Sequence, residues 1–224
     1  MSDDAIVLDG VERRYGDRTA LAGVTVSVPQ GATLAVFGAN GAGKTTLLRV
    51  LAGLLRPHGG TATVLGASLP QDAWKTRAQV GYLAHEPLLY RDLTVRQNLT
   101  FHAKLHGVQL RRVDELIEQV GLGGRADDAV RELSKGMAQR AAVARALLHD
   151  PPVLLLDEPR ANLDPAAAQA LEPLIGRASG RTRVLVSHDV ETALKEADLA
   201  LGLKDGRQEF ATRADAATIR ALYS

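Results

Sequence analysis

The sequence contains no cysteine, no long apolar run and almost no excess of either charge. Without cysteine among its 224 residues, disulfides, thiolate metal sites and cysteine nucleophiles are excluded. A membrane-spanning helix needs roughly 18 to 20 consecutive apolar residues, and no stretch approaches that length. Lysine and arginine number 27 against 26 acidic residues, which gives no electrostatic reason to expect nucleic acid as a partner. The acidic start MSDDAIVLDG is unlike a signal peptide, so we expect a cytoplasmic protein that reaches a membrane only through another subunit.

The apolar content fits a single globular domain over residues 1–224. Hydrophobic residues make up 46% of the chain, the normal range for a folded domain. Short β-rich runs alternate with helical patterns, and this order predicts an α/β protein with a mixed, mostly parallel sheet. The predicted strands are residues 5–11, 24–28, 33–37, 61–65, 79–83, 153–156, 182–187 and 198–203.

The predicted elements divide the domain into three parts. The first two strands flank the turn-like residues 15–17 and predict a small N-terminal antiparallel β-subdomain. Between residues 86 and 150 the strand signal disappears, and we expect an inserted helical subdomain there. Residues 1–85 and 151–224 then form the core together with the β-subdomain. The helices predicted inside the insertion are residues 93–106, 111–120 and 137–148.

Two further helical features are expected to face solvent. Residues 214–222 are typical of a short surface helix. His102 and His106 lie four residues apart in a predicted helix, a spacing that can place both on one face. No third ligand accompanies them, so solvated helix surface is preferred over a metal site.

The segment from Gly38 to Thr45 gives the strongest local signal. Its sequence GANGAGKT matches G-x-x-x-x-G-K-[ST], and the strand TLAVF before it and a helix predicted from Lys44 to Leu55 argue against a chance match. Glycines let backbone N–H groups approach phosphate oxygens, and a helix N-terminus adds partial positive charge. Lys44 should reach the β- and γ-phosphates of a nucleotide, and the Thr45 hydroxyl should ligate Mg²⁺. The residues expected to hold phosphate are Gly38, Asn40, Gly41, Ala42, Gly43, Lys44, Thr45 and Thr46.

Two carboxylates stand at the end of a predicted buried strand. Asp157 and Glu158 follow the apolar run VLLL, at the carboxyl edge where open α/β sheets bind ligands. Adjacent carboxylates there are costly unless a cation or a water molecule engages them. Asp157 suits Mg²⁺ bound through water, and Glu158 suits the role of general base for an attacking water. The alternative is an acidic turn before Pro159, which becomes less attractive beside a phosphate-binding loop.

Four segments, taken in order, resemble the signature set of ABC ATPases. They are GANGAGKTT, LSKGMAQR, VLLLDEP and VSHD, and the likeness runs from Tyr15 to about Gly206. The resemblance implies a P-loop NTPase core that hydrolyses ATP with Mg²⁺. It also implies a dimer, either of two identical chains or with a related ATPase. A transmembrane permease would be the partner that holds the dimer on the inner face of the cell membrane.

The resemblance also implies roles for single residues. Ser134 and Gly136 match the family's LSGGQ signature, which faces the γ-phosphate held by the opposite subunit, and Ser134 also reads as a helix N-cap. His188 resembles the histidine that contacts the γ-phosphate, although a lone histidine after a strand is more often structural. Asp164 resembles an aspartate of the loop that crosses the dimer interface. Tyr15 matches the aromatic that stacks on adenine; an ordinary hairpin aromatic is the alternative.

Some positions depart from the family's pattern. His85 stands where the family presents a glutamine that approaches Mg²⁺. Imidazole is softer than Mg²⁺ prefers, so either water mediates the contact or His85 acts in γ-phosphate sensing and coupling. Arg160 and Asn162 are unusual in the interface loop. Residues 81–107 and 132–159 look like the ATPase of the haem exporter used in cytochrome c biogenesis, and ATPases of drug or lipid exporters have similar stretches.

The expected function is therefore the ATPase subunit of an ABC transporter, with Glu158, His188 and Lys44 as catalytic residues. Export is favoured over import, and haem is one expected cargo. A drug or lipid exporter ATPase is the first alternative. A soluble, non-transport ABC ATPase is the second; the chain shows no long coiled coil, tandem ATPase domain or basic extension that would favour it.

Overall fold

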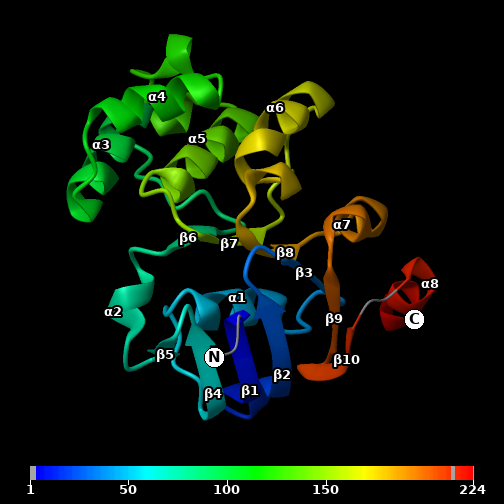
Figure 1. Cartoon of the computed structure of the whole chain (residues 1–224). Coiled ribbons are helices and arrows are strands. Elements are labelled where there is room, and N and C mark those ends of the chain that lie inside the picture. The colour runs from blue at the N-terminus through cyan, green and yellow to red at the C-terminus, as the bar shows by residue number, and fades with distance from the viewer. Residues whose placement is uncertain (1–3, 213–214, 224) are drawn as a thin grey trace.

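The computed structural model describes residues 4–212 and 215–223, which form two β-sheets with helices around them (Figure 1). The first sheet is antiparallel, with the strand order β2-β1-β4-β5. A two-residue turn joins its first two strands and sets Tyr15 opposite Arg18 at the tip of the hairpin. The strands are β1 (Asp4–Tyr15), β2 (Arg18–Pro29), β4 (Gly59–Val64) and β5 (Ala67–Leu69).

The second sheet has six strands in the order β10-β9-β3-β8-β7-β6. β10 runs antiparallel to β9, and the other neighbours pair in parallel. Every residue of β3, β7 and β8 is buried, as expected for parallel strands covered on both faces. This arrangement confirms the predicted α/β fold class. The strands are β3 (Thr33–Phe37), β6 (Val80–Leu83), β7 (Val153–Asp157), β8 (Thr182–Val186), β9 (Leu199–Lys204) and β10 (Arg207–Thr212).

Two strands, β5 and β10, fall outside the strands that the sequence predicts. β10 reads RQEFAT and has no buried residue; it takes its form from pairing with β9 across the turn at Asp205 and Gly206. β5 has three residues and pairs with β4. Backbone pairing rather than an apolar pattern defines both strands. β1 and β2 are also longer than predicted, for the same reason.

Alternate residues of the second sheet enter two separate hydrophobic cores. In β7, Leu154 and Leu156 pack with the helices between β6 and β7, whereas Val153 and Leu155 pack with α1 (Lys44–Leu51) and the first sheet. Figure 1 shows the same division, with those helices on one side of the second sheet and the antiparallel sheet on the other. α1 ends at Leu51 and not at the predicted Leu55.

The described chain between β6 and β7 is helical. α3 opens with a capping box in which Thr94 Oγ1 accepts from the N–H of Gln97. Outside this segment, α6 and α7 begin at the aspartate caps Asp164 and Asp189. The inserted elements are α3 (Val95–His106), α4 (Arg111–Gln119) and α5 (Lys135–Leu147), with 3₁₀ turns at Gly123–Arg125 and Val130–Glu132. The remaining helical elements are α2 (Ala73–Thr76), α6 (Pro165–Ile175), a 3₁₀ turn at Arg177–Ser179 and α7 (Val190–Glu196).

The prediction that His102 lies on a solvated helix surface is wrong. This residue is half-buried beside Arg145 of α5, and its Nε2 atom is buried with no hydrogen-bond partner in the described part of the chain. His106 is exposed, as expected, but its ring stacks on His149 with centroids 4.2 Å apart. The error has a packing cause, because α3 lies against α5 and turns one of its two histidines inward.

A helix lies near the C-terminus, as predicted. The prediction that this helix lies on the surface is wrong for Ile219 and Leu222. α8 (Ala216–Arg220) and a 3₁₀ turn (Ala221–Tyr223) lie within the predicted segment 214–222, whose first residue is outside the described residues. Ile219 and Leu222 are buried in the same hydrophobic core as Leu154 and Leu156, at its end near α7 and β9. The Tyr223 hydroxyl accepts a hydrogen bond from the N–H of Gly38 at 3.3 Å.

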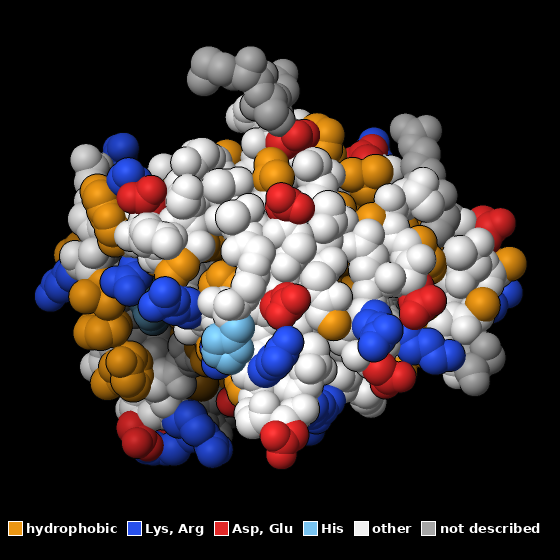
Figure 2. Space-filling view, turned by 90° about the horizontal axis from the view of Figure 1, so that it is seen from below, with side chains coloured by type: hydrophobic (Ala, Val, Ile, Leu, Met, Phe, Trp, Pro, Cys, Tyr) orange, Lys and Arg blue, Asp and Glu red, His pale blue; other side chains and the backbone are white. Residues whose placement is uncertain are grey.

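Acidic and basic side chains are interspersed on the face that Figure 2 shows, below the antiparallel sheet. The sequence as a whole has a formal net charge of +1. Among residues 4–212 and 215–223, no helix combines the length and the apolar character that a bilayer crossing requires.

Candidate nucleotide-binding site

Loops at the carboxyl ends of the parallel strands surround a cleft of about 460 Å³, here named the first cleft. Parallel strands end at one edge of a sheet, so the loops after β3, β6, β7 and β8 meet there. The tip of the β1–β2 hairpin also contributes. The predicted glycine-rich loop, the two carboxylates and both site histidines therefore share one cavity. Its lining is Tyr15, Arg18, Ala20, Asn40, Gly41, Gly43, Lys44, Thr45, Thr46, Arg49, His85, Asp157, Glu158, Val186 and His188.

Close backbone contacts fix the shape of the loop between β3 and α1. Gly38 and Gly43 have φ angles of 148° and 109°, which side-chain-bearing residues rarely adopt. A Cβ on Gly38 would lie 2.2 Å from the carbonyl oxygen of Leu203, and one on Gly43 would lie 2.3 Å from that of Ala20. Glycine is therefore required at both positions for steric reasons alone.

Gly38 and Ala42 do not line the first cleft, unlike the other predicted phosphate residues. The N–H of Gly38 donates to Tyr223, and the N–H of Ala42 donates to the carbonyl of Ala39 at 3.1 Å. The Ala42 side chain is buried in the core below the loop. Both residues thus shape the loop from beneath.

Lys44 lies at the start of α1 and is 8% exposed. Its Nζ atom donates to the carbonyl oxygens of Gly38 at 2.6 Å and Ala39 at 3.1 Å. Burial lowers the pKa of Lys44, while the nearby Glu158 and Asp157 carboxylates oppose that shift. The result is a cation held inside the loop, beside two carboxylates.

Thr45 and Asp157 form a partly buried pair of oxygen groups in the first cleft. The Thr45 hydroxyl donates to Oδ2 of Asp157 at 2.9 Å, and Asp157 is 3% exposed. Hydroxyl and carboxylate oxygens are the donors that hard divalent cations prefer. This donor set fits Mg²⁺. His85 is exposed at the rim of the same cleft and offers only a softer nitrogen donor.

Glu158 and His188 face each other at the ends of β7 and β8. The N–H of Glu158 donates to Val186 at 3.0 Å, and the N–H of His188 donates to Oε2 of Glu158 at 3.2 Å. The other carboxylate oxygen, Oε1, is buried and has no hydrogen-bond partner among the residues that the structure describes, and Nε2 of His188 lies 3.5 Å from it. One carboxylate oxygen is therefore held in place while the other remains available as a proton acceptor.

Burial raises the pKa of Glu158 above its usual value. The hydrogen bond and charge of His188 oppose the shift, and the charge of Asp157 adds to it. A carboxyl group with a raised pKa is a stronger base once it is ionised. The environment of Glu158 is thus suited to accepting a proton from water.

Gln139 of α5 supports the turn that carries Glu158. Its side chain is 3% exposed, and Nε2 lies 3.4 Å from the carbonyl oxygen of Glu158 and 3.3 Å from that of Pro159. No sequence pattern marks this residue beyond its place in the signature segment. It links the helix that follows Ser134 to the carboxylates of the first cleft.

Ser134, Gly136 and Asp164 line a second cleft of about 370 Å³, which shares no lining residue with the first. Ser134 Oγ accepts from the N–H of Met137 at 3.2 Å, which confirms the predicted N-cap; α5 begins at Lys135. Asp164 caps α6 by accepting from Ala167 at 2.8 Å. The remaining lining residues are Lys135, Met137, Arg140, Asn162, Leu163 and Ala167. The predicted site residues thus fall into two groups on one chain.

Two arginines of the first cleft escaped the sequence-based prediction. Arg18 lies opposite Tyr15 at the hairpin tip and donates from Nη2 to the carbonyl of Gly41 at 2.9 Å. Arg49 projects from α1 into the same lining. The guanidinium of Arg13 lies 4.9 Å from the ring centroid of Tyr15. No sequence motif marks Arg18 or Arg49, because only the fold brings them to the loop.

A sequence profile described as ABC transporter matches residues 21–161, more than half of the chain. The chain is 40% identical over 203 residues to a daunorubicin resistance ATP-binding protein of Streptomyces coeruleorubidus, covering 88% of this chain and 63% of that protein. It is 37% identical over 215 residues to the Nod factor export ATP-binding protein I of Ralstonia nicotianae, covering 92% and 66%. The chain therefore spans slightly less than two thirds of each of these relatives.

One similar solved structure is a dimeric, post-hydrolysis state of an ATP-binding cassette bound to ADP and Pi. Its TM-score is 0.83 at 26% sequence identity, over 94% of this chain and 99% of that one. The arrangement of sheets and helices is therefore the same in the two chains.

Proposed function

The chain belongs to the ABC transporter family of ATP-binding proteins, and on that premise we propose that it is the nucleotide-binding subunit that hydrolyses ATP to drive a separate transmembrane permease. The first cleft carries the proposal. It joins a glycine-rich loop, a partly buried Thr45–Asp157 pair and a Glu158–His188 pair in one cavity.

In this proposal the loop from Gly38 to Thr46 wraps the phosphates of ATP. Backbone N–H groups and the N-terminal end of α1 favour negative charge there. Lys44 exchanges its contacts with loop carbonyls for the β- and γ-phosphates. Tyr15, 44% exposed at the hairpin tip, offers its ring to adenine.

Mg²⁺ is the metal that the site would take, with Thr45 and Asp157 as its protein-derived holders. When bound, it neutralises charge on the phosphate oxygens. His85 stands at the rim, where it can sense the γ-phosphate or hold a water.

Glu158 acts as the general base in the proposed hydrolysis. The water oxygen bonds to the γ-phosphorus as the bond to the β–γ bridging oxygen breaks, and a water proton passes to Glu158. His188, hydrogen-bonded to Glu158 through its N–H, orients the carboxylate and reaches toward the γ-phosphate. Lys44 stabilises the negative charge on the transferred group.

The second cleft supports a dimer as the active form. Ser134, Gly136 and Asp164 lie in a cleft of their own, so they can complete an ATP site only on another copy or on a related ATPase. The similar cassette structure is itself dimeric and holds ADP and Pi. Two chains related by a two-fold axis would then bury two ATP molecules between them.

The proposed partner is a polytopic permease at the inner face of the cell membrane. Export is the proposed direction, since the two reported relatives are named for drug resistance and for Nod factor export. Haem is a narrower proposal for the cargo, and it is supported only by the likeness of residues 81–107 and 132–159 to the haem-exporter ATPase. The permease determines the cargo, so its identity is the deciding observation.

The function is tested with Glu158→Gln. We expect the purified wild type to release phosphate from ATP and the variant to lose about 100-fold or more, the usual contribution of a general base. With ATP and Mg²⁺ the variant should elute as a dimer in light-scattering chromatography. Glu115→Gln, an exposed carboxylate of α4, is the matched control and should behave as the wild type. An unchanged rate of ATP hydrolysis in Glu158→Gln would contradict the assignment of this site as the ATPase centre.

Transport is tested separately by affinity purification of the native protein from membranes. Recovery with a polytopic subunit, and ATP hydrolysis altered by it, supports the transporter. A purely soluble complex would instead favour a non-transport ABC ATPase.

A further inference from the structure

Arg183 is a fully buried arginine, the second residue of β8, with 1% of its surface exposed. Its guanidinium donates to Thr33 Oγ1 from Nε at 3.1 Å and from Nη2 at 2.9 Å, and from Nη1 to the Ile175 carbonyl at 3.1 Å. Nη1 also pairs with Oε2 of Glu196 at 2.7 Å. A buried guanidinium is costly unless its donors are satisfied, so this set of contacts fixes the Glu196 carboxylate at the end of α7.

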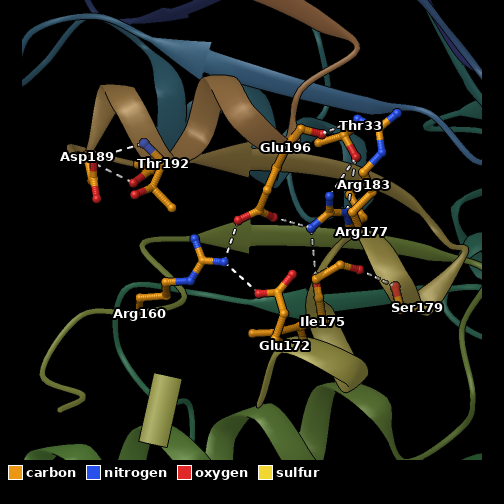
Figure 3. Close-up of polar contacts among 12 residues, drawn as sticks. Thr33, Arg160, Glu172, Ile175, Arg177, Ser179, Arg183, Asp189, Thr192 and Glu196 are labelled. Carbon is orange, nitrogen blue, oxygen red and sulfur yellow. Dashed lines mark hydrogen bonds and ion pairs between the residues drawn. The ribbon is translucent and has the colours of Figure 1, made fainter. Parts of the chain in front are cut away.

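Glu196 divides its two carboxylate oxygens between two arginines (Figure 3). Oε2 pairs with Arg183, and Oε1 pairs with Nη2 of Arg160. The same nitrogen of Arg160 lies 2.7 Å from Oε2 of Glu172 on α6. Side-chain exposure rises outward from 1% for Arg183 to 12% for Glu196 and 34% for Arg160. Two arginines and two glutamates balance each other, and Arg160 links Glu196 to the outermost member, Glu172.

Arg160 belongs to the loop of residues 158–164, which joins the two clefts. The first residue of the loop, Glu158, lines the first cleft, and its last three, Asn162 to Asp164, line the second. Arg160 itself lines neither cleft. Whatever it does for the two clefts, it therefore does through the backbone of this loop.

The helix that Arg160 reaches through Glu196 begins beside His188. Asp189 caps α7 by accepting from the N–H of Thr192 at 3.1 Å, and the N–H of His188 donates to Glu158. Arg160 therefore ties the loop that follows Glu158 to the helix that follows His188. The segments that carry Glu158 and His188 are therefore connected twice, once by the hydrogen bond between these two residues and once by the Arg160–Glu196 ion pair.

We propose that Arg160 is a positioning residue for ATP hydrolysis. By holding Glu196 and Glu172 at once, it keeps the 158–164 loop in the shape that presents Glu158 to the first cleft and Asn162–Asp164 to the second. The catalytic consequence rests on the proposed ATPase function. The structural role of Arg160, which is to hold the 158–164 loop through Glu196 and Glu172, does not depend on that function. Arginine suits the role because its planar fork can bind two carboxylates in fixed directions, which lysine cannot do.

Arg160→Gln removes both ion pairs while leaving Arg183 paired with Glu196. Glu172 is 38% exposed in its side chain, so water can solvate it and the variant should fold. We expect kcat for ATP to fall about 10- to 100-fold, as small misplacements of reacting groups do, with KM within about threefold. Arg160→Lys should recover part of the loss. ATP-dependent dimerisation in the Glu158→Gln background should weaken as well.

The matched control is Arg220→Gln, which removes a single arginine contact to the same helix. Arg220 pairs with Glu191 of α7 at 2.6 Å, and both side chains are at least 60% exposed. This variant should keep the wild-type kcat, KM and dimerisation. Amide hydrogen exchange supplies a second readout on all variants, without ATP. The N–H groups of Ala161 and Leu163, which donate to Glu158 and Arg160 within the loop, should exchange about tenfold faster in Arg160→Gln.

The two proposals fail in distinguishable ways. If the wild type neither hydrolyses ATP nor dimerises with it, the proposed ATPase function is wrong. Amide hydrogen exchange in the 158–164 loop then still tests whether Arg160 holds that loop. If the wild type is active and folded Arg160→Gln matches it in kcat, dimerisation and exchange, the inference about Arg160 is overturned. A loss equal in Arg160→Gln and Arg220→Gln would also overturn it, because the effect would then come from α7 in general.

Discussion

Glu158 adopts a left-handed backbone conformation, with a φ angle of 53°. For a side-chain-bearing residue this costs on the order of 1–3 kcal/mol, and it persists only where neighbours enforce it. Here the N–H of Glu158 is bonded to Val186, and Gln139 approaches the Glu158 carbonyl. The strained residue is the one to which we give the proton-accepting role, so the local cost and the proposed chemistry coincide.

Arg183 provides a stability prediction at the residue scale. Arg183→Met leaves Thr33 without its donors and Glu196 with one cation in place of two, so the free energy of unfolding should fall by about 3 kcal/mol. Urea denaturation measures this loss. Arg183→Met combined with Glu196→Leu should regain part of it, because no buried charge is then left behind. Arg125→Met, which breaks the exposed pair with Asp128, should cost less than about 1 kcal/mol; an equal cost in both single variants would contradict the buried network.

Site residues defined by a local motif could be predicted from the sequence, and those defined by distant pairing could not. Lys44 and Thr45 belong to a contiguous loop, and Asp157 and Glu158 follow an unmistakable apolar strand. Arg160 is different, since its partners lie 12 and 36 residues away and nothing local connects them. The two-cleft separation of Ser134 from the glycine-rich loop is likewise a property of the fold and not of spacing.

Helices α3 and α5 both begin at a hydroxyl-bearing N-cap residue, Thr94 and Ser134. Comparing the two residues therefore distinguishes a capping role from a role in ligand binding. Replacing Thr94 or Ser134 with alanine should cost about 1 kcal/mol of stability in either case. Only Ser134 lines the second cleft. Ser134→Ala should therefore also weaken ATP-dependent dimerisation and turnover about tenfold or more, as expected for a lost hydrogen bond to a charged group. Equal turnover in Ser134→Ala and Thr94→Ala would show that Ser134 is only a cap.

The packing of α3 on α5 makes stability depend on pH. Burial, with the charges of Arg145 and His106, lowers the pKa of His102 and of His149 to about 4, from 6.5; a contact with Val80 and the charge of Asp150 oppose the shift at His149. Between pH 6.5 and 4 the unfolded chain binds more protons than the folded chain. The free energy of unfolding therefore falls as pH falls through this window, by about 1–2 kcal/mol after allowance for solvent screening.

The measurement is urea denaturation at several pH values between 4 and 7. At pH values well above 6.5 both histidines become neutral in the unfolded chain as well, and their contribution to the slope disappears. The double variant His102→Leu/His149→Leu should show a flatter dependence than the wild type. A slope that survives unchanged in this variant would assign the effect to other groups.

Elements with burial on both faces were the easiest to predict. The strand at residues 33–37 was predicted with its observed bounds, because five buried residues in a row leave little ambiguity. β10 and the four-residue α2 carry no such pattern and depend on neighbours for their form. α6 is signalled by its Asp164 cap and Pro165, and α7 by its Asp189 cap, which are weak signs without the fold.

At the scale of the whole molecule, the proposed function gives each chain two unlike halves of a nucleotide site. The first cleft has the phosphate loop and the carboxylates, and the second has the signature serine and the interface loop. Neither half is complete, and α5 with the 158–164 loop connects them inside one chain. Under the proposed function, the protein would therefore hydrolyse ATP only as a dimer.

The most direct measurement of this central claim mixes two defective chains. Lys44→Ala damages the first cleft and Ser134→Arg the second, and each variant alone should hydrolyse almost no ATP. In an equal mixture, half of the dimers are mixed and carry one intact site, so ATP hydrolysis should recover to about a quarter of the wild-type rate. No recovery in the mixture of folded chains, or full activity of Ser134→Arg alone, would contradict a site shared between two subunits.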